Sequence, residues 1–160
     1  MPYVTDKTTI TVRHNFEAAH RLFLTPGKCE KIHGHSFWVD FTLHGSVDSA
    51  GMLDGLDFGD VKKKFRSFLD ENFDHRTLLN KDDPWAGAVW LTNPNDTDNI
   101  GHPVLLPGLF QTEGDPTTEN ITYWIATWGL QNFPWSVSHV EVVVHETTVN
   151  SATCRLARNL

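Results

Sequence analysis

A strict alternation of apolar and polar side chains over residues 35–44 constrains the fold of this chain more than any other feature. Successive side chains of a β-strand point to opposite faces, so the pattern predicts a strand in a sheet with one buried face. The apolar face consists of Phe37, Val39, Phe41 and Leu43. The chain must therefore supply a second layer that covers this face.

Two segments with the helical period of about 3.6 residues predict that covering layer. The first begins at Asp60, and the second follows Asp115-Pro116, where Asp suits the N-cap and Pro the first turn, and ends at Gly129. The first apolar stripe is Val61, Phe65, Phe68, Leu69 and Phe73, and the second is Ile121, Trp124, Ile125 and Trp128.

Three further segments carry strand patterns: residues 9–20, residues 140–146 and, more weakly, residues 152–158. The order of elements is then β-β-α-α-β-β. This order predicts an α+β fold in which an antiparallel four-stranded sheet carries two helices on one face. An open sheet of this kind has unpaired edges, so we expect the chain to associate with copies of itself.

Composition limits the class of protein. A chain of 160 residues with 39% hydrophobic and 21% charged residues suits one globular domain, here residues 1–160. The formal charge of −7 argues against a nucleic-acid binder, and no apolar run is long enough to span a membrane. Only two cysteines occur, Cys29 and Cys154, so no disulfide framework is expected and a cytoplasmic location is the simplest interpretation.

Three histidines near the start of the chain carry the chemistry: His20, His33 and His35. Neutral imidazole is a preferred zinc ligand, and three of them leave a fourth position open for water or substrate. On a strand, His33 and His35 point to the same face and can bind one ion together. Cys29, four residues before His33, is either a fourth ligand or a reactive thiol beside the metal.

The ordered set of motifs resembles the 6-pyruvoyl-tetrahydropterin synthase and 6-carboxy-tetrahydropterin synthase family. The matching pieces are Phe16-Glu17-Ala18-Ala19-His20-Arg21-Leu22, Cys29-Glu30-Lys31-Ile32-His33-Gly34-His35, Gly51-Met52, Asp57-Phe58, Asp74-His75, Pro116-Thr117-Thr118-Glu119-Asn120 and Glu146-Thr147. The resemblance implies the T-fold, in which three subunits close their sheets into a barrel and two trimers stack as a hexamer. It also implies active sites between subunits and a pterin substrate, dihydroneopterin triphosphate.

The resemblance also implies roles for particular residues. His20, His33 and His35 hold Zn²⁺, which makes a neighbouring C–H of the substrate acidic, while Cys29 is the base that removes the proton. Asp74 and His75 complete the proton-transfer set.

Glu146 is expected to bind the pterin, because one carboxylate can accept hydrogen bonds from both the ring N–H and the exocyclic NH₂. The second segment expected to bind substrate consists of Thr117, Thr118 and Glu119.

The spacing C-x-x-x-H-G-H, from Cys29 to His35, resembles the 6-carboxy branch of the queuosine (7-deazapurine) pathway. That branch converts 7,8-dihydroneopterin triphosphate to 6-carboxy-5,6,7,8-tetrahydropterin, acetaldehyde and triphosphate. Two alternatives stay open. One is a 6-pyruvoyl-tetrahydropterin synthase, which eliminates triphosphate without carbon–carbon cleavage. The other is a non-catalytic pterin-binding or zinc protein with a closed site of Cys29 and three histidines.

Residues 81–114 depart from the family pattern, where a short connection is expected. The segment contains apolar stretches around Trp85 to Leu91 and Val104 to Phe110. It is too apolar for a free linker, so we expect it to pack on its own subunit or on a neighbour. Because it follows Asp74-His75 closely, it is also a candidate for reshaping the substrate pocket.

Overall fold

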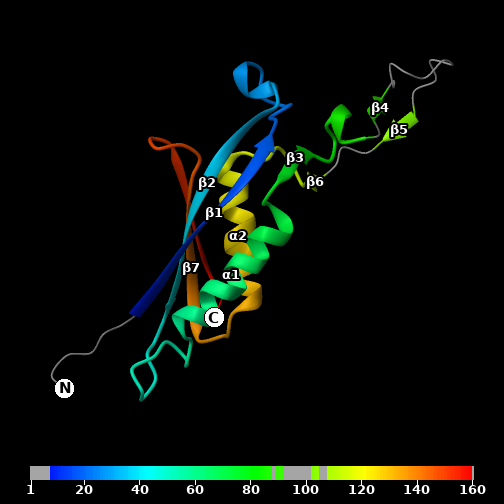
Figure 1. Cartoon of the computed structure of the whole chain (residues 1–160). Coiled ribbons are helices and arrows are strands. Elements are labelled where there is room, and N and C mark those ends of the chain that lie inside the picture. The colour runs from blue at the N-terminus through cyan, green and yellow to red at the C-terminus, as the bar shows by residue number, and fades with distance from the viewer. Residues whose placement is uncertain (1–7, 88, 92–101, 105–107, 160) are drawn as a thin grey trace.

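A six-stranded sheet with two helices on one face forms the body of the protein (Figure 1). This computed structural model describes residues 8–87, 89–91, 102–104 and 108–159. The main sheet contains β1 (Thr8–His20), β2 (His33–Gly45), β3 (Arg76–Asn80), β6 (Leu109–Thr112), β7 (Val137–His145) and β8 (Ser151–Ala157). The helices are α1 (Phe58–Asn72) and α2 (Thr118–Asn132), with short 3₁₀ turns η1 (Lys28–Glu30) and η2 (Pro84–Ala86). A separate two-stranded sheet pairs β4 (Val89–Leu91) with β5 (His102–Val104).

The β1–β2 pair is the centre of the sheet. Strand β2 confirms the strand that the alternation over residues 35–44 predicts. The two strands pair antiparallel without interruption, from Thr8 opposite Gly45 to His20 opposite His33. The apolar face of β2 is fully buried under the helices, with 0% exposure of Phe37, Val39, Phe41 and Leu43. The matching apolar face of β7 is buried as well, with 0% exposure of Val140, Val142 and Val144. These residues form one core between the sheet and the helices.

Both helices are confirmed, with different ends. Helix α1 begins at Phe58, two residues earlier than predicted, because the Asp57 carboxylate caps it by accepting from the Gly59 N–H at 2.6 Å. Helix α2 continues past Gly129 to Asn132. A Cβ on Gly129 would lie 2.8 Å from the Phe41 ring, so this glycine lets the helix approach the sheet and does not end it. No helix within the described ranges is long and apolar enough to cross a membrane.

The predicted four-stranded antiparallel sheet is too small. The antiparallel order β1-β2-β7-β8 is present, but β3 and β6 extend the sheet beyond β1 in parallel orientation. The sequence hid β3 because Leu78, Leu79 and Asn80 are all buried, so no alternation marks the strand. Strand β6 lies in the segment 81–114, and that segment therefore contributes to the main sheet.

Candidate metal centre

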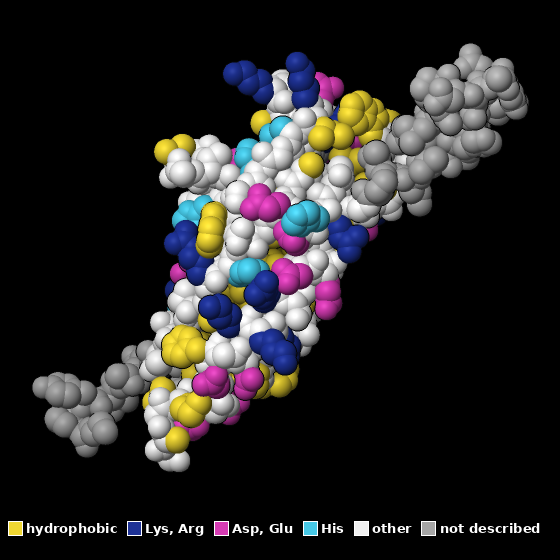
Figure 2. Space-filling model, viewed as in Figure 1, with side chains coloured by type: hydrophobic (Ala, Val, Ile, Leu, Met, Phe, Trp, Pro, Cys, Tyr) yellow, Lys and Arg dark blue, Asp and Glu magenta, His cyan; other side chains and the backbone are white. Residues whose placement is uncertain are grey.

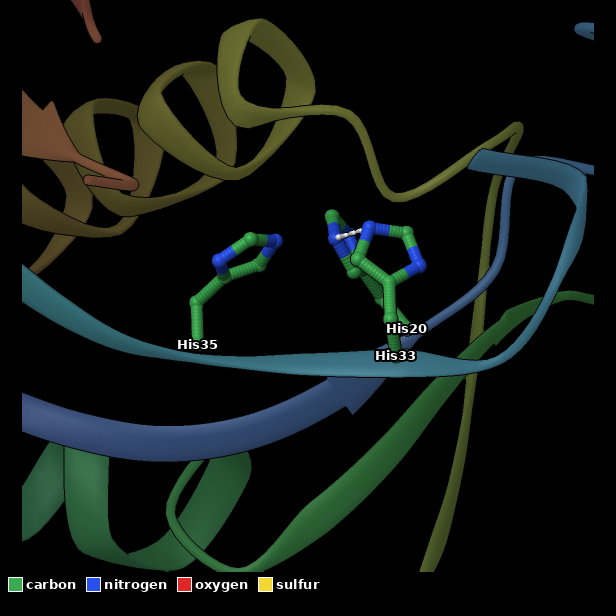
Figure 3. A group of neighbouring side chains, drawn as sticks. All are labelled: His20, His33 and His35. Carbon is green, nitrogen blue, oxygen red and sulfur yellow. Dashed lines mark hydrogen bonds between the residues drawn. The ribbon is translucent and has the colours of Figure 1, made fainter. Parts of the chain in front are cut away.

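The register of β1 and β2 brings the three histidines together at one end of the sheet. His20 is the last residue of β1 and pairs with His33, the first residue of β2, while His35 follows two residues later on the same face. Their candidate ligand nitrogens all lie within 4.8 Å of one another. Figure 3 shows the three rings converging on one space above the strands.

Backbone carbonyls fix which nitrogen of each ring faces that space. The Nδ1–H of His20 donates to the Pro116 carbonyl at 2.8 Å, and the Nδ1–H of His33 donates to the Lys31 carbonyl at 2.7 Å. A carbonyl can only accept, so in the neutral rings both protons sit on Nδ1 and both Nε2 atoms carry lone pairs. Metal-binding histidines are usually held in this way by their other nitrogen.

The inward-facing nitrogens lack protein partners suited to them. His20 Nε2 and His33 Nε2 lie 3.2 Å apart, and two neutral acceptors at that distance repel unless a proton or a cation lies between them. The Nε2 of His35 is buried and makes no hydrogen bond to any described residue. Three unsatisfied imidazole nitrogens that converge from two strands fit a bound metal ion.

Burial keeps the site in its metal-binding protonation state. The His20 side chain is 1% exposed. Desolvation lowers the pKa of His20 below 6.5, against the opposing effects of the Pro116 hydrogen bond and Glu146. Desolvation likewise lowers the pKa of His35, although Glu146 opposes it. Both rings are therefore neutral at pH 7, which is the form that binds metals.

Glu146 lies beside the three histidines. It directly follows β7, and its Oε1 is 3.8 Å from the Nε2 atoms of both His20 and His35. The hydroxyl of Thr118, the first residue of α2, donates to the same oxygen at 2.9 Å. Thr117 is the N-cap of α2 and accepts from a backbone N–H, while Glu119 is exposed. Of the predicted pterin-binding residues, Thr118 and Glu146 thus reach the metal centre together.

Cys29 lies on η1, in an exposed part of the loop that joins the two ligand-bearing strands. The thiol is outside the group of ligand atoms formed by the three histidines, so the described residues do not assemble a closed Cys-His₃ site. The Leu22 N–H donates to the Cys29 carbonyl at 2.9 Å and closes the loop. This arrangement favours an open three-histidine metal site over a closed structural site that includes the thiol.

Asp74 and His75 form a hydrogen-bonded pair on the opposite face of the sheet. His75 Nδ1 donates to Asp74 Oδ2 at 2.6 Å, and Asp74 Oδ1 accepts from the Glu17 N–H at 2.8 Å. Burial alone would raise the pKa of Asp74, but these hydrogen bonds hold it below its usual value. The pair adjoins Glu17 and Ser36, whose side chains alternate away from the histidine face. One chain therefore does not bring His75 to its own metal centre.

Sequence reasoning missed the groups that orient the histidines. The partners at Lys31 and Pro116 are backbone carbonyls, which leave no signature in the residue type. It also missed Asp115, whose buried carboxylate accepts from the Leu24 N–H and the Asn80 side chain. Its place directly before Pro116 was visible only as a helix-start signal.

Comparison with known proteins agrees with this geometry. The model of the family described as 6-pyruvoyl tetrahydropterin synthase matches residues 9–157. The 6-carboxy-5,6,7,8-tetrahydropterin synthase of Rickettsia conorii is 36% identical over 112 residues, which cover 69% of this chain and 72% of that protein. The protein of the same name from Rickettsia typhi is 36% identical over 78 residues, 48% of this chain and 55% of that relative. Human 6-pyruvoyl tetrahydrobiopterin synthase is 30% identical over 132 residues, 72% of this chain and 89% of that protein.

Solved structures confirm the fold. A catalytic-residue mutant of 6-pyruvoyltetrahydropterin synthase from Plasmodium vivax superposes with a TM-score of 0.72 at 22% identity, covering 96% of this chain and 100% of that chain. The corresponding protein of Plasmodium falciparum gives a TM-score of 0.73 at 18% identity, with the same coverage. The predicted T-fold is therefore present in this chain.

Replacing His20, His33 or His35 singly by Ala should remove the bound metal, because two nitrogens and water bind an ion far more weakly than three nitrogens. The measurement is metal content per chain by mass spectrometry after loading with Zn²⁺ and desalting. His14→Ala, a histidine on β1 outside this cluster, is the matched control and should keep the metal. Full occupancy in all three ligand variants would refute the site.

Proposed function

The chain belongs to the 6-pyruvoyl tetrahydropterin synthase family, and we propose that it is a zinc-dependent lyase of the 6-carboxy branch. Its reaction converts 7,8-dihydroneopterin triphosphate and one water molecule to 6-carboxy-5,6,7,8-tetrahydropterin, acetaldehyde and triphosphate, a step of queuosine biosynthesis. The observation that carries the proposal is the convergence of three imidazole nitrogens beside Glu146, all within 4.8 Å of one another and with His35 Nε2 buried and without a hydrogen bond to any described residue. The names of the Rickettsia relatives and the spacing of Cys29 before His33 support the branch.

Zinc is the proposed metal, held by the Nε2 atoms of His20, His33 and His35. Three neutral nitrogens with an open fourth position are typical of catalytic zinc, and the absence of a carboxylate or thiolate within the described three-histidine group agrees with this. When bound, the ion supplies Lewis-acid polarisation of the substrate's side-chain hydroxyls.

Cys29 is the proposed base. Its loop, residues 21–32, starts directly after the ligand His20 and ends directly before the ligand His33, so the thiol is tethered to the metal centre at both ends. A base must come within hydrogen-bond reach of the carbon whose proton it removes. The exposed position of Cys29 leaves its sulfur accessible to a substrate side chain bound over the histidines.

Glu146 is the proposed anchor for the pterin ring, assisted by Thr118. The carboxylate has one oxygen fixed by the Thr118 hydroxyl, and the exposed fraction of its side chain is 24%, so it remains accessible. Two pterin donors, a ring N–H and the exocyclic NH₂, match the two oxygens of one carboxylate. Thr117 and Glu119 lie next to Thr118 at the start of α2 and are proposed to contribute to the same pocket.

Assembly supplies the remaining proton-transfer groups in this proposal. The Asp74–His75 pair lies on the sheet face away from the histidines of its own chain, so we assign it to the centre of a neighbouring subunit. Strands β6 and β8 stand at the two edges of the main sheet, where another chain can pair. A trimer, or a hexamer of two trimers, would pair the sheet edges and also bring Asp74 and His75 of one subunit to the histidines of another. A monomer in light scattering that is fully active would contradict this assembly.

A 6-pyruvoyl-tetrahydropterin synthase is the second candidate, because the human enzyme of that type aligns over 89% of its length. The two candidates differ in one product. Incubation with dihydroneopterin triphosphate should yield 6-carboxy-tetrahydropterin and acetaldehyde, identified by mass spectrometry and by trapping of the aldehyde. The control Cys29→Ala should keep its zinc and form neither product, because a base is removed and no ligand is. Formation of 6-pyruvoyl-tetrahydropterin without acetaldehyde would overturn the branch assignment.

Glu146→Gln should weaken pterin binding roughly ten- to hundredfold, because one of the two acceptor oxygens is replaced by an NH₂ donor and the bonds to a charged group are lost. Zinc content should stay unchanged, since Glu146 is not a proposed ligand. Pterin affinity is measured by fluorescence titration of zinc-loaded protein. Glu141→Gln, on the opposite face of β7, is the matched control and should bind like the wild type. Equal affinities for the two variants would count against the anchoring role.

A further inference from the structure

The start of the segment 81–114, around η2, packs on Arg21, the residue that follows the candidate ligand His20. Arg21, directly after His20, is 9% exposed. Its Nε lies 3.2 Å from Asp83 Oδ2, so the two side chains form an ion pair, although the contact lacks hydrogen-bond geometry. The Asp83 side chain is completely buried. The Arg21 guanidinium also lies over the Trp85 ring, 4.2 Å from its centroid. Arg21 is thus held between an acid and an aromatic face, both supplied by this segment.

The turn that holds Arg21 is itself fixed. Asp83 Oδ1 accepts from the Trp85 N–H at 2.8 Å and caps η2, while the Asp83 N–H donates to the Asn80 carbonyl at the end of β3. Ala86 is 1% exposed and anchors the turn against the body. A buried carboxylate without its cation is strongly unfavourable, so Asp83 requires Arg21 in this place.

Leu22, the residue after Arg21, is hydrogen-bonded to the proposed base. The Leu22 N–H, one residue on, donates to the Cys29 carbonyl at 2.9 Å. The Leu24 N–H donates to Asp115 Oδ2 at 2.9 Å. Between these contacts and His33 the loop is exposed, from residue 24 to residue 32. Leu22 thus joins Arg21, its covalent neighbour, to Cys29, its hydrogen-bond partner.

We infer that Asp83 and Trp85 are positioning residues, which act through Arg21 to hold Cys29 at the distance from the metal centre that the reaction needs. The inference rests on the proposed function, because it assigns the segment a task in the same site. In Figure 2, hydrophobic side chains gather over η2 (residues 84–86), and Lys and Arg side chains project beside them near η1 (residues 28–30). In this inference Asp83 and Trp85 do not contact the substrate. Their replacement should therefore lower kcat and leave KM unchanged.

Three variants test the positioning role. Asp83→Asn keeps the cap on η2 but removes the charge that pairs with Arg21, and Trp85→Ala removes the aromatic face. Trp85→Phe keeps an aromatic face and is the conservative variant. The matched control is Asp82→Asn, the same substitution at the exposed neighbouring acid. Because Trp85 is 48% exposed, its replacement does not open the core.

Steady-state kinetics with dihydroneopterin triphosphate should show a kcat at least about tenfold lower in Asp83→Asn and Trp85→Ala, since a misplacement near 1 Å lowers rates up to ~10²-fold. KM and zinc content should stay within about twofold of the wild type, and Trp85→Phe should recover most of the kcat. Asp82→Asn should behave as the wild type. A normal kcat in both variants, equal losses in Trp85→Phe and Trp85→Ala, or loss of zinc with the loss of kcat would overturn the inference.

A second measurement separates this inference from the proposed function. In a Cys154→Ser background, the rate of alkylation of Cys29 by iodoacetamide reports the surroundings of the thiol without any substrate. Asp83→Asn and Trp85→Ala should change that rate severalfold relative to Asp82→Asn and Trp85→Phe. Unchanged alkylation would contradict the positioning role. A wild-type protein that does not turn over the substrate, with altered alkylation in these variants, would instead overturn the proposed function alone.

Discussion

The pairing of His20 with His33 at the end of the β1–β2 ladder is the constraint on which the site depends. A slip of one residue in a strand register moves every side chain to the other face, and it would separate these ligands. The register is fixed by the core beside the site, by buried Phe16 and Phe37 and by the fully buried face of β2. The ring of Phe37 contacts those of His20 and His35, with centroids 5.5 Å and 5.4 Å away. The candidate metal centre is thus a direct extension of the hydrophobic core.

Elements from the second half of the chain complete the centre at the same end of the sheet. The Pro116 carbonyl orients His20, Thr118 at the start of α2 holds Glu146, and Glu146 leaves the end of β7. Because Gly129 lets α2 approach Phe41 and Val140 closely, the packing of the helix on the sheet also sets the position of its first residue. The candidate ligand His20 and the proposed pterin anchor Glu146 are therefore both held by the start of α2.

Sequence reasoning succeeded where one side chain carries both pattern and chemistry. The alternation around Phe37 predicted the central strand, and His33 and His35 on that strand were correctly expected to lie on one face, where they meet His20. It failed where burial erases the pattern, as in Leu78 and Leu79 of β3, which are buried together and lengthen the sheet beyond four strands. It also failed at Gly129, which resembles a helix end in sequence and is a packing contact in the structure. Carbonyl partners such as that of Pro116, and long-range pairs such as Arg21 with Asp83, depend on tertiary contacts that a local pattern does not encode.

The central claim is that three imidazole nitrogens hold a metal ion with a position left open for chemistry. X-ray absorption at the zinc edge of the zinc-loaded protein tests it most directly. The account predicts three Zn–N distances of about 2.0–2.1 Å together with oxygen from water, and no sulfur ligand. A Zn–S distance of about 2.3 Å would show that Cys29 closes the site as a fourth ligand, and it would contradict both the open metal centre and the role of Cys29 as a base.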